Sequence, residues 1–145
     1  MGVASFANSR LVERLGTRLI SQSAVLALIA LSLLHLIVIY AGLETLTSYI
    51  VLQALSMTCI GLCGSNFGAM AMEPVGHIAG TASSLQGFII SIGAVLVGSA
   101  IGQSYAGTTL PLAIGYLCIG LSVLAIVYVI EEGQLFHARM VPSQA

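Results

Sequence analysis

The sequence predicts an all-α membrane protein with four transmembrane helices, and three observations lead to this fold class. Of the 145 residues, 58% are hydrophobic and only 6% are charged, and the mean hydropathy is +1.06. A soluble domain ordinarily carries about a quarter charged residues, because its surface faces water. The few charges are also separated by long uncharged stretches. A membrane-spanning helix needs about 20 apolar residues, so these stretches have the length of membrane crossings.

The uncharged stretches divide into four predicted helices. Asp, Glu, Lys and Arg do not occur in residues 19–43, 45–72 and 78–130. The third stretch is too long for one crossing, and residues 102–111 within it form a turn-like patch, GQSYAGTTLP. A β-barrel is disfavoured, because its strands would give short alternating segments. The four helices are therefore predicted at residues 19–42, 49–72, 83–102 and 111–130.

The distribution of arginine predicts the orientation. The protein has no Lys, and its four Arg are at positions 10, 14, 18 and 139. With four crossings, the N-terminal segment, the central loop and the tail at 131–145 lie on one side of the membrane. Arg and Lys are enriched in cytoplasmic loops. Both termini are therefore predicted to be cytoplasmic.

The central loop interrupts the apolar sequence in a way that suits a helix reversal. Pro74 cannot continue a helix and disfavours helical geometry at Glu73. Gly76 and Gly80 permit a tight turn. Residues 83–86, SSLQ, have the spacing of a capping box, so the third helix is predicted to begin at Ser83.

Small residues form a narrow stripe on each of the two middle helices. The stripes are Ala54, Thr58, Gly61, Ser65 and Gly68 on the second helix, and Ser84, Gly87, Ser91, Ala94, Gly98 and Gly102 on the third. Such stripes let helix backbones approach closely in lipid. Gly61, Gly68, Gly87, Gly98 and Gly102 are therefore predicted to be helix-packing positions. The first helix is mostly bulky and aliphatic, and we expect it to face lipid.

A second face of the 49–72 helix is the candidate binding surface. Its members are spaced by three and four residues, and they are Ser56, Cys59, Cys63, Asn66 and Met70. A buried amide in hydrocarbon needs a partner or a wet cavity. One interpretation is that Asn66 makes an interhelical hydrogen bond. The other is that this face lines a substrate cavity, because polarizable Met and Cys side chains suit varied apolar ligands.

Other reactive residues give weaker signals. An ionisable group inside a membrane helix is by default a functional hypothesis, and His35 is such a group, although its neighbours are expected to face lipid. Cys59 and Cys63 lie one turn apart without further Cys or His nearby, so no metal site is predicted and we interpret them as small apolar fillers. The sequence has no phosphate-binding loop, nucleophile motif, paired intramembrane carboxylates or basic nucleic-acid surface. Neither an enzyme nor a cofactor is predicted.

Two stretches resemble a known family. NSRLVERLGTRLI (residues 8–20) resembles the cytoplasmic loop between the eighth and ninth helices of major facilitator superfamily transporters. The residues that fit the degenerate loop signature are Glu13, Arg14, Gly16 and Arg18. Ser9 replaces the first Gly of that signature, and Thr17 replaces an Arg. The more specific stretch is NFGAMAMEPVGHIAGTASSLQGF (residues 66–88), which resembles the tenth-to-eleventh helix region of the drug-resistance branch related to bicyclomycin-resistance (Bcr/CflA) exporters.

The resemblance implies a position for this chain within that fold. The four helices at 19–130 would be the last four of twelve, part of the C-terminal bundle. Residues 1–18 would be the stub of the preceding helix and a cytoplasmic loop, and 131–145 the cytoplasmic tail. The implied activity is proton-coupled efflux of drugs or other small molecules across a bacterial-type inner (plasma) membrane. The implied partners of the full-length parent are the lipid bilayer, a small-molecule substrate and protons.

A transporter of this type needs two six-helix bundles around a midplane site, whereas four helices are predicted here. The chain is therefore expected to be a fragment that is inactive alone, with the missing N-terminal helices or another subunit as its partner. Two alternatives remain. A small four-helix multidrug exporter would act as a dimer, but its chemistry requires a carboxylate inside a helix, and Glu44 and Glu73 lie at helix ends. A non-transporting membrane subunit is the second alternative.

Overall fold

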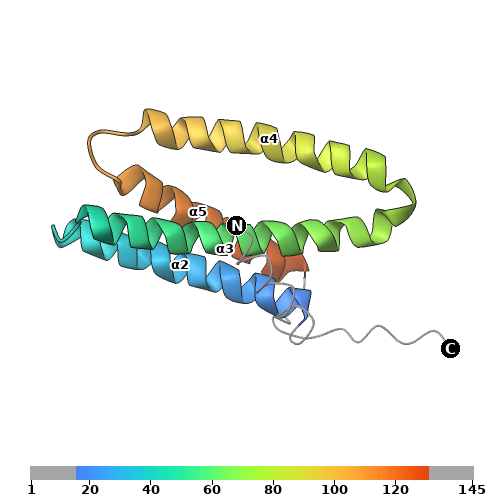
Figure 1. Ribbon diagram of the computed structural model, residues 1–145, viewed down its shortest axis with the longest axis horizontal. Coiled ribbons are helices and arrows are strands. Elements are labelled where there is room, and N and C mark those ends of the chain that lie inside the picture. Colours follow the sequence, from blue (N-terminus) through green and yellow to red (C-terminus); the bar gives the residue numbers. More distant parts are fainter. Residues whose placement is uncertain (1–15, 131–145) are drawn as a thin grey trace.

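The computed structural model describes residues 16–130, and all regular structure in that range is helical. In chain order the elements are α2 (Thr17–Tyr40), α3 (Leu46–Met72), the 3-10 helix η1 (Glu73–Ile78), α4 (Ala79–Gln103) and α5 (Leu110–Ile130). Figure 1 shows that the chain reverses direction after α2, at η1 and after α4, so that successive long helices run antiparallel. The prediction of an all-α fold is confirmed for this range.

Three helical segments of the described range are long and apolar enough to cross a membrane. They are α2, the continuous helical run Leu46–Gln103 and α5. The middle segment consists of α3, η1 and α4, and the chain turns back on itself at η1 (Figure 1). Val75 inside η1 has non-helical angles, φ −115° and ψ 22°. The lengths and compositions are those of a membrane-embedded protein.

The turn between α2 and α3 closes one helix and opens the next. Gly42 has φ +66°, and its N–H donates to the Ile39 carbonyl (3.0 Å) while Leu43 N–H donates to the Val38 carbonyl (3.1 Å). This is the Schellman arrangement that ends a helix at a left-handed glycine, so α2 ends at Tyr40 and not at the predicted residue 42.

A capping box opens α3 three residues before the predicted start. The Thr45 hydroxyl accepts from Ser48 N–H (3.1 Å), and the Ser48 hydroxyl accepts from Thr45 N–H (2.9 Å). These reciprocal bonds satisfy two N–H groups that a helix start leaves unpaired. The first turn at Leu46 is therefore stable without an acidic residue.

The capping box predicted at Ser83 is wrong. The α4 helix begins at Ala79, whose N–H already donates to the Gly76 carbonyl of η1. The hydroxyls of Ser83 and Ser84 instead donate to the Gly80 carbonyl, at 3.0 Å each. Ser side chains inside a helix commonly bond back to the preceding turn. The 3-10 turn leads directly into α4, so no side-chain cap is needed.

Helices α2, α3 and α5 pack together, and the expectation that the first helix faces lipid is wrong for the side of α2 that packs against α3 and α5. Leu28 of α2, Cys59 of α3 and Tyr116 of α5 are each buried and form one core cluster. α2 also has the longest set of buried residues of the four long helices. Aliphatic side chains pack equally well against a helix or against lipid tails. A bulky composition therefore does not show which of the two surrounds a helix.

Gly120 of α5 lies at a close contact with α2. A Cβ placed on Gly120 would lie 2.8 Å from Cγ1 of Ile29 on α2 and 3.8 Å from the Ile29 backbone nitrogen. A contact below 3.0 Å forces a shift of the neighbouring atoms. Small residues at helix contacts permit such close approach. Gly120, which is not among the predicted packing positions, lies where α5 meets α2 and leaves no room for a side chain.

Helix α4 lies apart from the α2–α3–α5 unit (Figure 1), and none of its residues is buried in the described range. It approaches α5 where Ile101 meets Gly115, and α3 where the Gln86 amide nitrogen lies 3.6 Å from a Cβ placed on Gly68. The other four predicted packing glycines have open space around them within the chain. They are Gly61, Gly87, Gly98 and Gly102. Within the described chain α4 buries none of its residues, so the packing role of these four glycines stays a prediction that concerns helices outside it.

Candidate functional site

The predicted cavity face of α3 lies mostly inside the helix packing. Ser56 and Asn66 are each 3% exposed and Cys59 is 9% exposed, while Cys63 is half-buried. The Cys63 thiol donates to the Ser21 carbonyl of α2, with sulfur and oxygen 3.8 Å apart. This face of α3 therefore contacts α2 in the described chain. Its role in a substrate cavity remains a prediction.

The rows of side chains along the α2–α3 contact are called seams below, and the row on α2 has the same kind of spacing as the face of α3. The buried residues of that helix include Ser21, Val25, Leu28, Ser32 and His35, spaced by four, three, four and three. A repeat of this spacing places side chains along one seam between two helices. Ser21 and Ser32 satisfy their hydroxyls by donating to carbonyls four residues earlier, at 2.7 Å each. The seam therefore accepts small polar residues without exposing unpaired groups.

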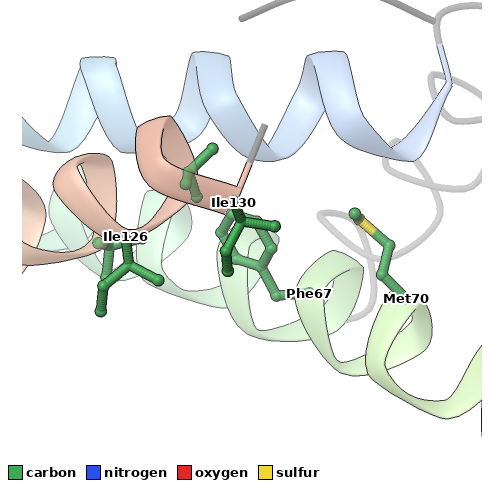
Figure 2. Close-up of a pocket in the computed structure, with 6 residues that line it drawn as sticks. Phe67, Met70, Ile126 and Ile130 are labelled. Carbon is green, nitrogen blue, oxygen red and sulfur yellow. The ribbon is translucent and has the colours of Figure 1, made fainter. Parts of the chain in front are cut away.

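Met70, the last member of the predicted cavity face, borders an apolar cleft between α3 and α5. The cleft has a volume of about 230 Å³ and is lined by Phe67, Met70, Val123, Ile126, Val127 and Ile130. Figure 2 shows Phe67 and Met70 on α3 across from Ile126 and Ile130 on α5. An apolar lining suits a hydrocarbon group and gives no polar group that would orient it.

Asn66 provides a test of the two interpretations of this face. Because its side chain is buried in the α3 seam, Asn66→Ala is expected to lower the stability of the intact protein in detergent by about 0.6 kcal/mol, the average for interhelical hydrogen bonds in membranes. Thermal denaturation of wild type, Asn66→Ala and the exposed control Ser65→Ala would measure this. An unchanged stability together with an altered substrate profile of a full-length parent would instead favour the cavity.

The loop signature predicted at residues 9–18 falls only partly within the described range. Glu13 and Arg14 lie outside the described residues. Gly16 has φ +81°, a conformation that disfavours residues with a Cβ, and its carbonyl accepts from Ile20 N–H at 3.4 Å. Arg18 is partly exposed in the first turn of α2. The positive φ of Gly16 thus explains why a glycine is favoured directly before α2.

A polar cluster that the sequence analysis did not identify lies at the opposite end of the unit, around Glu44. His35 of α2 is 2% exposed, and its Nε2 lies 3.1 Å from Oε1 of Glu44 in the α2–α3 turn. The same carboxylate oxygen accepts from the hydroxyl of Thr109, which directly precedes α5. The Tyr49 ring of α3 packs beside the imidazole, with centroids 6.0 Å apart. Side chains from three helix ends therefore meet at Glu44.

The surroundings of Glu44 favour its ionised form. The hydrogen bond from Thr109 is the largest cause that lowers the pKa of this carboxyl, partial burial acts in the opposite direction, and the hydrogen bond and charge of His35 lower it further. The net result is a pKa below the ordinary range. A carboxylate that accepts hydrogen bonds is stabilised in its charged form. Glu44 therefore holds its two donors as an anion near neutral pH.

A further polar contact joins α3 and α5 one turn deeper. The Gln53 amide nitrogen donates to the Tyr116 hydroxyl at 2.8 Å, whereas the Gln53 amide oxygen is buried without a partner. Within residues 16–130 no three His, Cys, Asp or Glu side chains are grouped as metal ligands. The polar groups at this end of the unit thus offer hydrogen bonds and one acid–base pair, His35 and Glu44.

Comparisons with protein-family models, with curated proteins and with solved structures gave no match to this chain.

Proposed function

We propose that this chain is part of a membrane transporter for small molecules, of the major facilitator type and close to the drug-efflux branch, and that it works together with helices that are not in this sequence. The resemblance at residues 8–20 and 66–88 supports the family. The fold supports the membrane location, because its long helices have the length and composition of membrane crossings. The proposal includes four crossings, with α3 and α4 each crossing once.

The surface of α4 is the observation that carries the need for a partner. Its glycine stripe is as open as its aliphatic faces, and Gly98 has no atom of this chain near its Cβ position. Close-packing residues favour contact with another helix in lipid. The α4 stripe and the exposed stripe of α3 would then pack against the N-terminal helices of a parent transporter or against another subunit.

The decisive experiment uses the DNA upstream of Met1 together with a transport assay. We expect an in-frame extension that encodes about eight further apolar segments, the number required to complete a twelve-helix transporter. The extended protein should lower ethidium accumulation in an efflux-deficient bacterium, and the 145-residue chain alone should not. Dye export by the chain alone would favour a small dimeric exporter. No export by either form would favour a non-transporting subunit.

Topology gives the second test of the proposal. Single cysteines at Thr47, His77 and Ala106, all exposed, would be introduced into a variant whose native cysteines are replaced by serine. An impermeant thiol reagent applied to intact cells is expected to label positions 47 and 106 but not position 77. Position 77 should react only after the membrane is opened. Labelling of position 77 in intact cells would contradict both the orientation and the four crossings.

A further inference from the structure

The contact at Glu44 differs from the other polar contacts of the described chain because one carboxylate oxygen joins groups that are far apart in sequence. His35 and Glu44 are separated by the end of α2, and Thr109 comes from the start of α5. The imidazole is almost wholly buried, and the Glu44 side chain is 25% exposed. The carboxylate is thus reachable by protons from water, while its donors are held in the packed end of the unit.

We propose that His35, Glu44 and Thr109 form a charge-dependent clamp that holds the start of α5 against the α2–α3 turn, and that neutralising Glu44 opens it. The ionised carboxylate offers two oxygens as acceptors and attracts both donors. A proton on the carboxylate removes the negative charge and turns one of its oxygens into a donor. Neither Thr109 nor His35 is then attracted by a charge.

A proton on His35 has the opposite effect on the contact. Both ring nitrogens of a protonated imidazole are donors, so the bond to Glu44 persists and gains charge attraction. The Tyr49 phenol of α3 packs beside the imidazole, and the Tyr116 phenol of α5 lies deeper, against Gln53. Acid cannot charge a phenol. Among the described residues near this end, Glu44 is therefore the group whose protonation weakens the clamp.

The direction of the pH effect follows from the Glu44 pKa. That pKa is lowered in the folded chain, so the ionised form is favoured by folding. The contribution of Glu44 to stability is then fully present above the ordinary glutamate value of about 4.3 and is lost as the pH falls through the lowered value. The clamp is closed at neutral pH and opens in acid.

The position of Thr109 determines which part of the fold is released when the clamp opens. Its carbonyl accepts the first-turn N–H groups of Leu112 and Ala113, at 3.0 and 3.2 Å. The residue that binds Glu44 therefore also begins α5. Release of its hydroxyl frees the α4–α5 turn and the first turn of α5, and it leaves the deeper Gln53–Tyr116 contact in place. The opening is local to this end of the unit.

The test measures the distance between the two turns in the full chain in lipid nanodiscs. Spin labels at Leu43→Cys and Ala106→Cys, both exposed positions, in a background without native cysteines, report that distance by pulsed electron resonance. Wild type is expected to give one narrow distribution at pH 7 and a broad one in acid. Glu44→Gln should give the broad distribution at pH 7. A hydrogen bond to a charged group shifts the ratio of closed to open forms by roughly tenfold or more.

Two variants separate the clamp from general loosening. Tyr116→Phe removes the uncharged α3–α5 hydrogen bond and should keep the narrow distribution at pH 7 and the acid response. His35→Gln retains a donor without a titratable ring, so its distribution at pH 7 should fall between wild type and Glu44→Gln. A narrow distribution for Glu44→Gln at pH 7, or an acid response equal to that of wild type, would overturn the proposal.

Discussion

Gly120→Leu is expected to destabilise the protein by about 1–3 kcal/mol, the usual cost of forcing extra atoms into a packed contact. The new Cβ would lie 2.8 Å from Cγ1 of Ile29, with the Ile29 backbone nitrogen at 3.8 Å. A contact this short forces either the Ile29 side chain or α5 itself to shift, and the larger Leu side chain adds to that displacement. Thermal denaturation of the detergent-solubilised chain, followed by helical circular dichroism, measures the loss.

Gly98→Leu is the matched control for this prediction. It makes the same substitution in α4, where no atom of the chain lies within 4 Å of the new Cβ, and it should leave the stability of the isolated chain nearly unchanged. The same variant in a complete transporter would be harmful if the α4 stripe packs against other helices. Equal destabilisation of both variants in the isolated chain would contradict the assignment of Gly120 to the α2–α5 contact.

Leu28→Ala is expected to produce the second large effect, on the order of 2 kcal/mol, because it leaves a cavity among packed side chains. Leu28 is 3% exposed and belongs to the cluster with Cys59 and Tyr116. Leu33 lies in the same helix but is 46% exposed. Leu33→Ala therefore removes the same atoms from a position that faces outward. Urea or thermal unfolding of the two variants should differ by more than 1 kcal/mol, and equal values would place α2 in lipid after all.

The membrane class and the helix positions followed from composition and charge spacing alone. The long helices begin and end within four residues of their predicted limits, and the deviations have local causes. Thr45 and Ser48 form a capping box in which Ser stands where Glu or Gln is usual, so the sequence pattern did not indicate it. Gly42 ends α2 before its apolar run stops. Charge-free stretches show where helices lie, whereas caps depend on single side-chain contacts.

The packing arrangement could not be predicted in the same way. The three-and-four spacing of Ser56, Cys59 and Asn66 is visible in the sequence, and it marks a seam that contacts α2. The same spacing in α2, from Ser21 to His35, was a usable signal for its partner seam. Small-residue stripes indicate faces able to approach a helix. They do not indicate whether that helix belongs to the same chain.

The polar cluster at Glu44 illustrates a different limit. The sequence identifies His35 as an ionisable group in a helix, but its partner Glu44 lies in a turn, and Thr109 follows another helix much later in the sequence. No spacing rule connects these positions. They meet only because α5 returns to the end of α2, which is a property of the packing of the three helices.

The contact between α2 and α5 also determines when packing can be completed while the chain is being synthesised. Domains and segments form from the N-terminus as the chain emerges, so α2 and α3 can pair as soon as α3 is made. Their third neighbour, α5, is produced only after α4 has been synthesised, and until then Leu28 and Cys59 lack Tyr116 as a packing partner. A nascent chain that stops after α4 therefore displays an unfinished helix pair to the lipid. Quality-control proteases that recognise incompletely packed membrane helices would find their substrate at that stage.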